Sequence, residues 1–108
     1  MNYSVLAIPP FDRQIKRLVK KYPSLKKEYA DLIGALAQQP DQGTPIGNHC
    51  YKIRLAITSK GKGKSGGARV ITYVQVIHHS VYLLAIYDKA EQADIADTDL
   101  KNLLKLIP

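Results

Sequence analysis

The spacing of the apolar residues changes between residues 36 and 51, and this change limits the fold more than any other feature. Between residues 11 and 36, apolar residues recur every three or four positions, as on one face of a helix. Between residues 51 and 87, they alternate with polar residues or form short runs rich in Val, Ile and Tyr, as in strands. A helical part followed by a stranded part is typical of an α+β domain.

Two helices are expected in the first part. Pro10 suits the first turn of a helix, whose apolar face consists of Phe11, Ile15, Leu18, Val19 and Tyr22. Pro23 ends this helix and Ser24 can cap the next one. The apolar face of the second helix consists of Leu25, Tyr29, Leu32, Ile33 and Leu36. Because the link is short, the two helices should form an antiparallel hairpin.

Along the sequence, strands are expected both before and after this helical hairpin. Residues 1–8 predict a first strand, whereas residues 38–48, with two prolines and two glycines, predict a loop. Three strands follow at residues 51–57, 69–77 and 81–87, and a short helix begins near Asp97. The predicted order is β-α-α-β-β-β(-α) in a single domain over residues 1–108. It implies an antiparallel sheet with the helical hairpin packed on one face.

Charge is distributed unevenly. The net charge is +7, and no Asp or Glu lies between Gln42 and Tyr87, where the cations are Lys52, Arg54, Lys60, Lys62, Lys64 and Arg69. An unscreened cationic stretch favours an anionic partner. Residues 59–67 contain no apolar side chain and predict an exposed connection. No signal-peptide pattern or long apolar run is present, which predicts a soluble, cytoplasmic protein without membrane contact.

Alternation along the strand places Lys52 and Arg54 on one sheet face, roughly 7 Å apart. If the three strands form a meander, Arg69, Tyr87 and Lys89 share that face, and Tyr73 also points outward. Such groups suit RNA cleavage, in which a 2′-hydroxyl attacks phosphorus, cations stabilise the transition state and an acid protonates the leaving oxygen. Passive binding of a polyanion would use the same charges. His49 and Cys50 adjoin without a second pair to complete a zinc site, so no metal or cofactor is expected.

Four segments resemble RelE/HigB-type toxins of type II toxin–antitoxin systems: residues 50–55, 59–67, 68–73 and 83–91. The most specific part is the Lys-Gly-Lys-Gly-Lys-Ser-Gly-Gly-Ala-Arg string at residues 60–69. The resemblance covers nearly the whole chain and implies the RelE-like fold. It also implies a ribosome-dependent, metal-independent endoribonuclease that cuts translated mRNA.

The resemblance further implies roles for individual residues. Lys52 would activate the 2′-hydroxyl, Arg54 and Arg69 would hold the phosphate, and Lys89 or Tyr87 would protonate the leaving oxygen. Contacts to RNA or the ribosome would come from Lys60, Lys62, Lys64 and Tyr73. One departure concerns the general base: where the RelE pattern has a Tyr, this chain has Ile95.

The family also implies a partner, a cognate antitoxin, through which alone operator DNA would be bound. Two other functions fit the same sequence. A ParE-like toxin would inhibit DNA gyrase on the same fold, although such chains generally lack this set of Lys and Arg residues. A nucleic-acid-binding module without catalysis would need the same charges.

Overall fold

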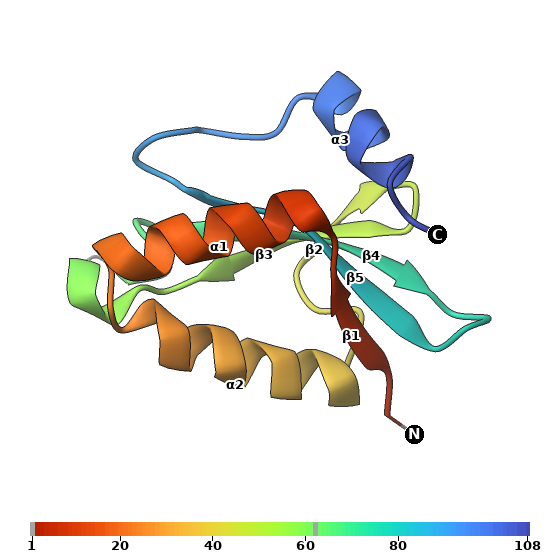
Figure 1. Cartoon of the computed structure of the whole chain (residues 1–108), viewed down its shortest axis with the longest axis horizontal. Helices are drawn as coiled ribbons and strands as arrows, with labels where there is room; N and C mark the ends of the chain where they lie inside the picture. The colour runs from red at the N-terminus through yellow and green to blue at the C-terminus, as the bar shows by residue number, and fades with distance from the viewer. Residues whose placement is uncertain (1, 62) are drawn as a thin grey trace.

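A computed structural model describes residues 2–61 and 63–108 and shows a five-stranded sheet with helices on both sides (Figure 1). The helices are α1 (Pro9–Lys21), α2 (Leu25–Gln38) and α3 (Asp97–Leu104), with a 3-10 turn at Thr58–Lys60. The strands are β1 (Ser4–Ala7), β2 (Thr44–Gly47), β3 (Cys50–Leu55), β4 (Ala68–Gln75) and β5 (Ser80–Asp88). The predicted α+β class is confirmed, with one additional strand, β2.

The sheet has the order β1-β5-β4-β3-β2. Strands β3, β4 and β5 form the predicted antiparallel meander. Strand β1 is parallel to β5, with Ser4 opposite Ser80. Strand β2 lies in the stretch predicted to be a loop, and it pairs with β3 through a two-residue turn. Both turn residues, Asn48 and His49, have positive φ, as a type I′ hairpin requires.

The two long helices contribute one stripe of buried side chains each. Phe11, Ile15 and Leu18 of α1 are buried, as are Leu25, Leu32 and Leu36 of α2. They join a single apolar cluster with the sheet, and α1 packs along β5. Ser24 stands at the start of α2 as predicted, but its hydroxyl accepts a hydrogen bond from the Ser59 N–H (2.9 Å) instead of capping the helix.

A β-bulge in β5 reverses part of the predicted sheet face. Ile71 lies opposite Ala85, but the next residue, Thr72, lies opposite Leu83, so Leu84 is an extra residue. One extra residue moves the following side chains to the other face. Tyr82 therefore lies beside Tyr73 on the face that carries Arg69 and Tyr87, whereas strict alternation along the strand would turn it to the other face.

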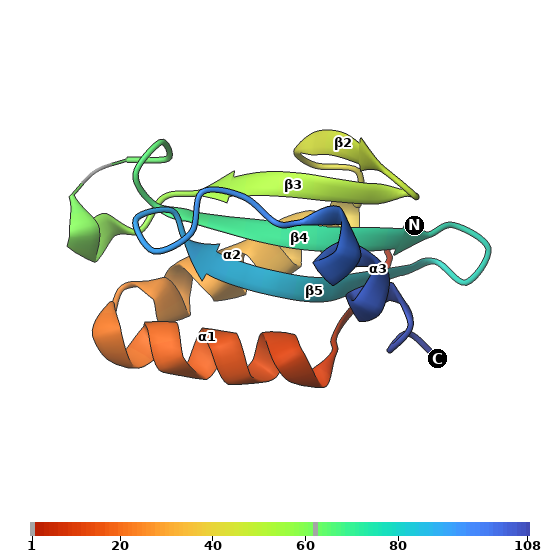
Figure 2. The same cartoon turned by 90° about the horizontal axis from the view of Figure 1, so that it is seen from above.

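The C-terminal helix covers part of the face that carries the predicted site. Figures 1 and 2 show α3 and the segment before it over β4 and β5, on the side of the sheet away from α2. Leu100 of α3 is buried, and Leu103 and Leu104 are half-buried. In the described part of the chain, no helix has both the length and the apolar character needed to cross a bilayer.

Candidate active site

The predicted catalytic side chains lie in two neighbouring rows of the sheet. Arg54 of β3 lies opposite Arg69 of β4, which lies opposite Tyr87 of β5. Lys52 belongs to the next row on the same face, opposite Ile71. Side chains opposite each other on antiparallel strands have their Cβ atoms about 4.5–5.5 Å apart. The meander therefore brings Lys52, Arg54, Arg69 and Tyr87 together on one face.

Arg69 lies on this face, but it is not the free cation that the sequence predicted. Its side chain is only 6% exposed. The guanidinium donates hydrogen bonds to the carbonyl oxygens of Lys64 (2.9 Å), Ala68 (3.1 Å) and Ser65 (3.2 Å). Arg69 thus fixes the loop that precedes β4. The expectation that it faces solvent was wrong, because the loop folds back over it.

The side chain of Lys60 is also buried, although the sequence predicted an exposed RNA contact. Its side chain is 7% exposed and forms an ion pair with Asp88, whose side chain is 1% exposed. The Tyr22 hydroxyl (2.7 Å) and the Ala90 N–H (3.0 Å) also donate to this carboxylate. Burial alone would raise the pKa of Asp88, but these hydrogen bonds, first that from Lys60, lower the pKa to about 2. Lys60 therefore has a structural role.

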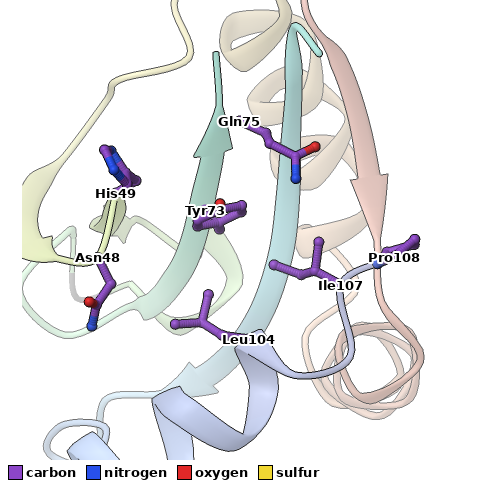
Figure 3. Close-up of a pocket in the computed structure, with 7 residues that line it drawn as sticks. All are labelled: Asn48, His49, Tyr73, Gln75, Leu104, Ile107 and Pro108. Carbon is purple, nitrogen blue, oxygen red and sulfur yellow. The ribbon is translucent and has the colours of Figure 1, made fainter. Parts of the chain in front are cut away.

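The remaining predicted RNA contacts have different surroundings. Lys64 is exposed, and with Lys52 and Arg54 it lines a hollow of about 490 Å³ beside β3. Tyr73 is half-buried and lies under the end of α3, where Leu104 and Ile107 line a second hollow with it (Figure 3). Lys62 lies outside the described residues. The open part of the cationic face is thus the part around Lys52, Arg54 and Lys64.

Lys89, directly after β5, is half-buried, and its ammonium group donates to the Ala93 carbonyl oxygen (3.1 Å). Among the described residues, the neighbouring Glu91 forms no ion pair with Lys89. It forms ion pairs with Arg17 (3.4 Å) and Lys21 (3.7 Å) of α1 instead. These contacts shape the segment between β5 and α3 and place it beside the cationic face.

Asp94, which the sequence analysis did not select, lies at the centre of the site. Its Oδ1 atom accepts hydrogen bonds from the Ile95 N–H (2.8 Å), Lys52 Nζ (3.2 Å) and the Tyr87 hydroxyl (3.5 Å). The Ile95 N–H and then Lys52 lower the pKa of Asp94. The only signal for this residue in the sequence is its position next to Ile95, where the chain departs from the RelE pattern.

Tyr87 is buried beneath this segment. Burial, and next the charge of Asp94, raise the pKa of Tyr87 above the ordinary value of 10. The phenol therefore keeps its proton at neutral pH and can donate it. Cys50 is buried as well, and burial raises the pKa of its thiol to about 11, which makes it unsuitable as a nucleophile. Among the described residues, no group of three or more His, Cys, Asp or Glu side chains could hold a metal ion.

Comparison with known proteins gives one family. The model of the family described as the RelE toxin of the RelE/RelB toxin–antitoxin system matches residues 12–107. The structure of free E. coli RelE toxin, a double mutant, is similar over 100% of both chains, with 14% identity and a TM-score of 0.65. The RelBE2 toxin–antitoxin complex of Mycobacterium tuberculosis matches 82% of this chain and 99% of that chain, with 17% identity and a TM-score of 0.57. Another structure of isolated E. coli RelE covers 97% of this chain and 99% of its own, with 15% identity and a TM-score of 0.56.

Proposed function

The chain belongs to the RelE toxin family, and from this premise we propose that it is a ribosome-dependent endoribonuclease that cleaves translated mRNA without a metal ion. The observation that carries the proposal is the convergence of Lys52, Arg54 and Tyr87 on one sheet face. This face is open around Lys52, Arg54 and Lys64, while Tyr87 lies buried beside them. Cations and a protonated phenol on one surface match the needs of phosphodiester cleavage.

The proposed reaction begins when a ribose 2′-oxygen attacks the adjacent phosphorus. The bond from phosphorus to the 5′-oxygen breaks, which leaves a 2′,3′-cyclic phosphate and a 5′-hydroxyl. Lys52 and Arg54 donate to the non-bridging oxygens as negative charge develops there. Lys52 takes this role instead of activating the 2′-hydroxyl, because it is an ammonium group paired with Asp94. The acid that protonates the leaving oxygen is Tyr87 or Lys89.

A second cationic surface supports contact with ribosomal RNA. Five cations lie on the solvent side of α1, opposite its buried stripe, and all are exposed: Arg13, Lys16, Arg17, Lys20 and Lys21. They span about 12 Å of helix at 1.5 Å per residue. Because α1 lies beyond β5, this surface is separate from the site at Lys52. One RNA could therefore occupy the site while another phosphate backbone contacts the helix.

A cognate antitoxin is the second proposed partner. The RelBE2 structure is a toxin–antitoxin complex, and it shares its fold with this chain. An antitoxin with an anionic segment would compete with RNA for Lys52, Arg54 and Lys64. Any binding of the pair to operator DNA would be made by the antitoxin.

The proposed function can be tested by primer extension on a reporter transcript after the chain is induced without an antitoxin. The wild-type chain should cut the transcript only where ribosomes translate it. Lys52→Ala should abolish the cuts, and Lys26→Ala, an exposed lysine on α2, should leave them unchanged. Intact transcripts with supercoiling defects would instead indicate a gyrase inhibitor, and cutting of untranslated transcripts would contradict ribosome dependence.

A further inference from the structure

The proposed reaction needs a group that accepts the proton of the 2′-hydroxyl. Lys52 is an ammonium group in an ion pair, and Arg54 is a guanidinium. Tyr87 keeps its proton because its pKa is raised by burial. These side chains stabilise charge or donate protons, so they do not supply the base. The base must come from another residue near the same face.

The carboxylate of Asp94 is fixed through one oxygen, and its other oxygen is open to a ligand. Its Oδ1 atom accepts the three hydrogen bonds from the Ile95 N–H, Lys52 and Tyr87. Its Oδ2 atom has no hydrogen bond among the described residues, and the side chain is 64% exposed. Three donors on one oxygen fix the carboxylate, while the second oxygen stays open to a ligand that approaches Lys52.

We propose that Asp94 is the general base of the site, an inference that rests on the proposed endoribonuclease function. Asp94 Oδ2 accepts the proton of the 2′-hydroxyl as the 2′-oxygen bonds to phosphorus. The bond to the 5′-oxygen breaks, and that oxygen takes a proton from Tyr87 or Lys89. Solvent then removes the proton from Asp94 and restores the acid, so protons and charge balance over one turnover.

The surrounding charges are consistent with this role. A carboxylate near a phosphate would repel it by about 1 kcal/mol at 4 Å in water. Lys52, which contacts Asp94, and Arg54, two residues along the strand, offset this repulsion. The lowered pKa of Asp94 keeps it ionised at neutral pH, so that it is always ready to accept a proton. Its weaker basicity is the cost of being held by three donors.

The test compares Asp94→Asn with Asp97→Asn. Asparagine keeps an oxygen for the three donors but cannot accept the proton. Asp97 is an exposed carboxylate at the start of α3, and its change to Asn alters the net charge equally. Single-turnover cleavage is measured on ribosome complexes with two mRNAs, one normal and one with sulfur as the bridging 5′ atom. A thiolate leaves without a proton, because thiol pKa values are near 8.5.

Asp94→Asn should slow cleavage of both mRNAs by about 10²- to 10⁴-fold, the usual contribution of a general base. Its rate should rise about tenfold per pH unit as hydroxide replaces the base. Asp97→Asn should cleave at the wild-type rate. A variant that lacks the acid, Tyr87→Phe or Lys89→Met, should regain rate on the sulfur linkage, which distinguishes loss of the acid from loss of the base.

Two results would overturn the assignment of Asp94. The first is a wild-type rate for Asp94→Asn. The second is recovery of Asp94→Asn on the sulfur linkage, which would mean that Asp94 acts on the leaving group. In the first case, tighter RNA binding by Asp94→Asn would show that the carboxylate fills the place of a phosphate. Failure of the wild-type chain to cut any mRNA would refute the proposed function itself, so the two failures are distinct.

Discussion

The buried ion pair between Lys60 and Asp88 allows a direct test of what fixes the 3-10 turn after β3 against the end of β5. Lys60 belongs to the 3-10 turn after β3, whereas Asp88 ends β5, so the pair joins two distant parts of the chain. Both side chains are almost fully buried. Lys60→Met keeps a long unbranched side chain and removes the charge together with its hydrogen bond to Asp88. Asp88 would then keep its hydrogen bonds from Tyr22 and Ala90 but lose its cation.

The expected loss can be worked from the pKa of Asp88. A fall from 3.8 to about 2 corresponds to about 2 kcal/mol of stability, at 1.36 kcal/mol per pKa unit. Removing one partner of a buried pair usually costs about 3–5 kcal/mol, because the other charge stays buried. Two remaining donors to Asp88 favour the lower end of that range. We therefore expect Lys60→Met to lower the free energy of unfolding by about 3 kcal/mol.

Urea unfolding followed by far-ultraviolet circular dichroism measures this loss, with Lys64→Met as the control because Lys64 is exposed in the same loop. The pKa of Asp88 is lowered in the folded state, so its contribution is complete above about pH 4 and is lost as pH falls towards 2. The difference between wild type and Lys60→Met should therefore shrink over that interval. An equal effect of Lys60→Met and Lys64→Met at neutral pH would refute the buried pair.

Three further outcomes follow from other contacts. Arg69→Ala should lower the free energy of unfolding by about 2 kcal/mol, because three carbonyl oxygens lose a charged donor. The loop before β4 should also be cleaved faster by proteases, and an unchanged midpoint of urea unfolding would contradict the structure. Thr72→Val should raise the free energy of unfolding by about 1 kcal/mol, since the buried hydroxyl has no hydrogen-bond partner among the described residues. Calorimetry measures this change, and a lower free energy of unfolding would mean that the hydroxyl is hydrogen-bonded. Cleavage should survive EDTA when polyamines keep the ribosomes intact, and a strict metal requirement would exclude the proposed chemistry.

The parts of the fold that the sequence predicted correctly are those governed by periodic burial. The stripe of Phe11, Ile15 and Leu18 is buried as expected for a helix that covers a sheet. Strict alternation in β3 also placed Lys52 and Arg54 on one face. Both patterns repeat over several residues, so a single exception does not hide them.

The features that were missed depend on single residues or on tertiary contacts. The turn at Asn48 and His49 has the left-handed conformations of a hairpin, but His is uncommon there and the prolines suggested a loop. The bulge at Leu84 has no signal in a continuous apolar run. Burial of Lys60 depends on Asp88, which is 28 residues away, and the place of Asp94 depends on how an irregular segment crosses the sheet. None of these follows from local pattern.

The parallel pairing of β1 with β5 constrains how the protein is synthesised. Ser4 is made before the two long helices, yet its partner Ser80 is made 76 residues later. Until β5 emerges, the nascent chain has an unpaired first strand and an α1 without the strand on which it packs, and such exposed edges favour aggregation and proteolysis. Products that stop before β5 should therefore be degraded. Because Tyr87 and Asp94 are made after Lys52 and Arg54, a competent site can form only once β5 and the segment after it have been made.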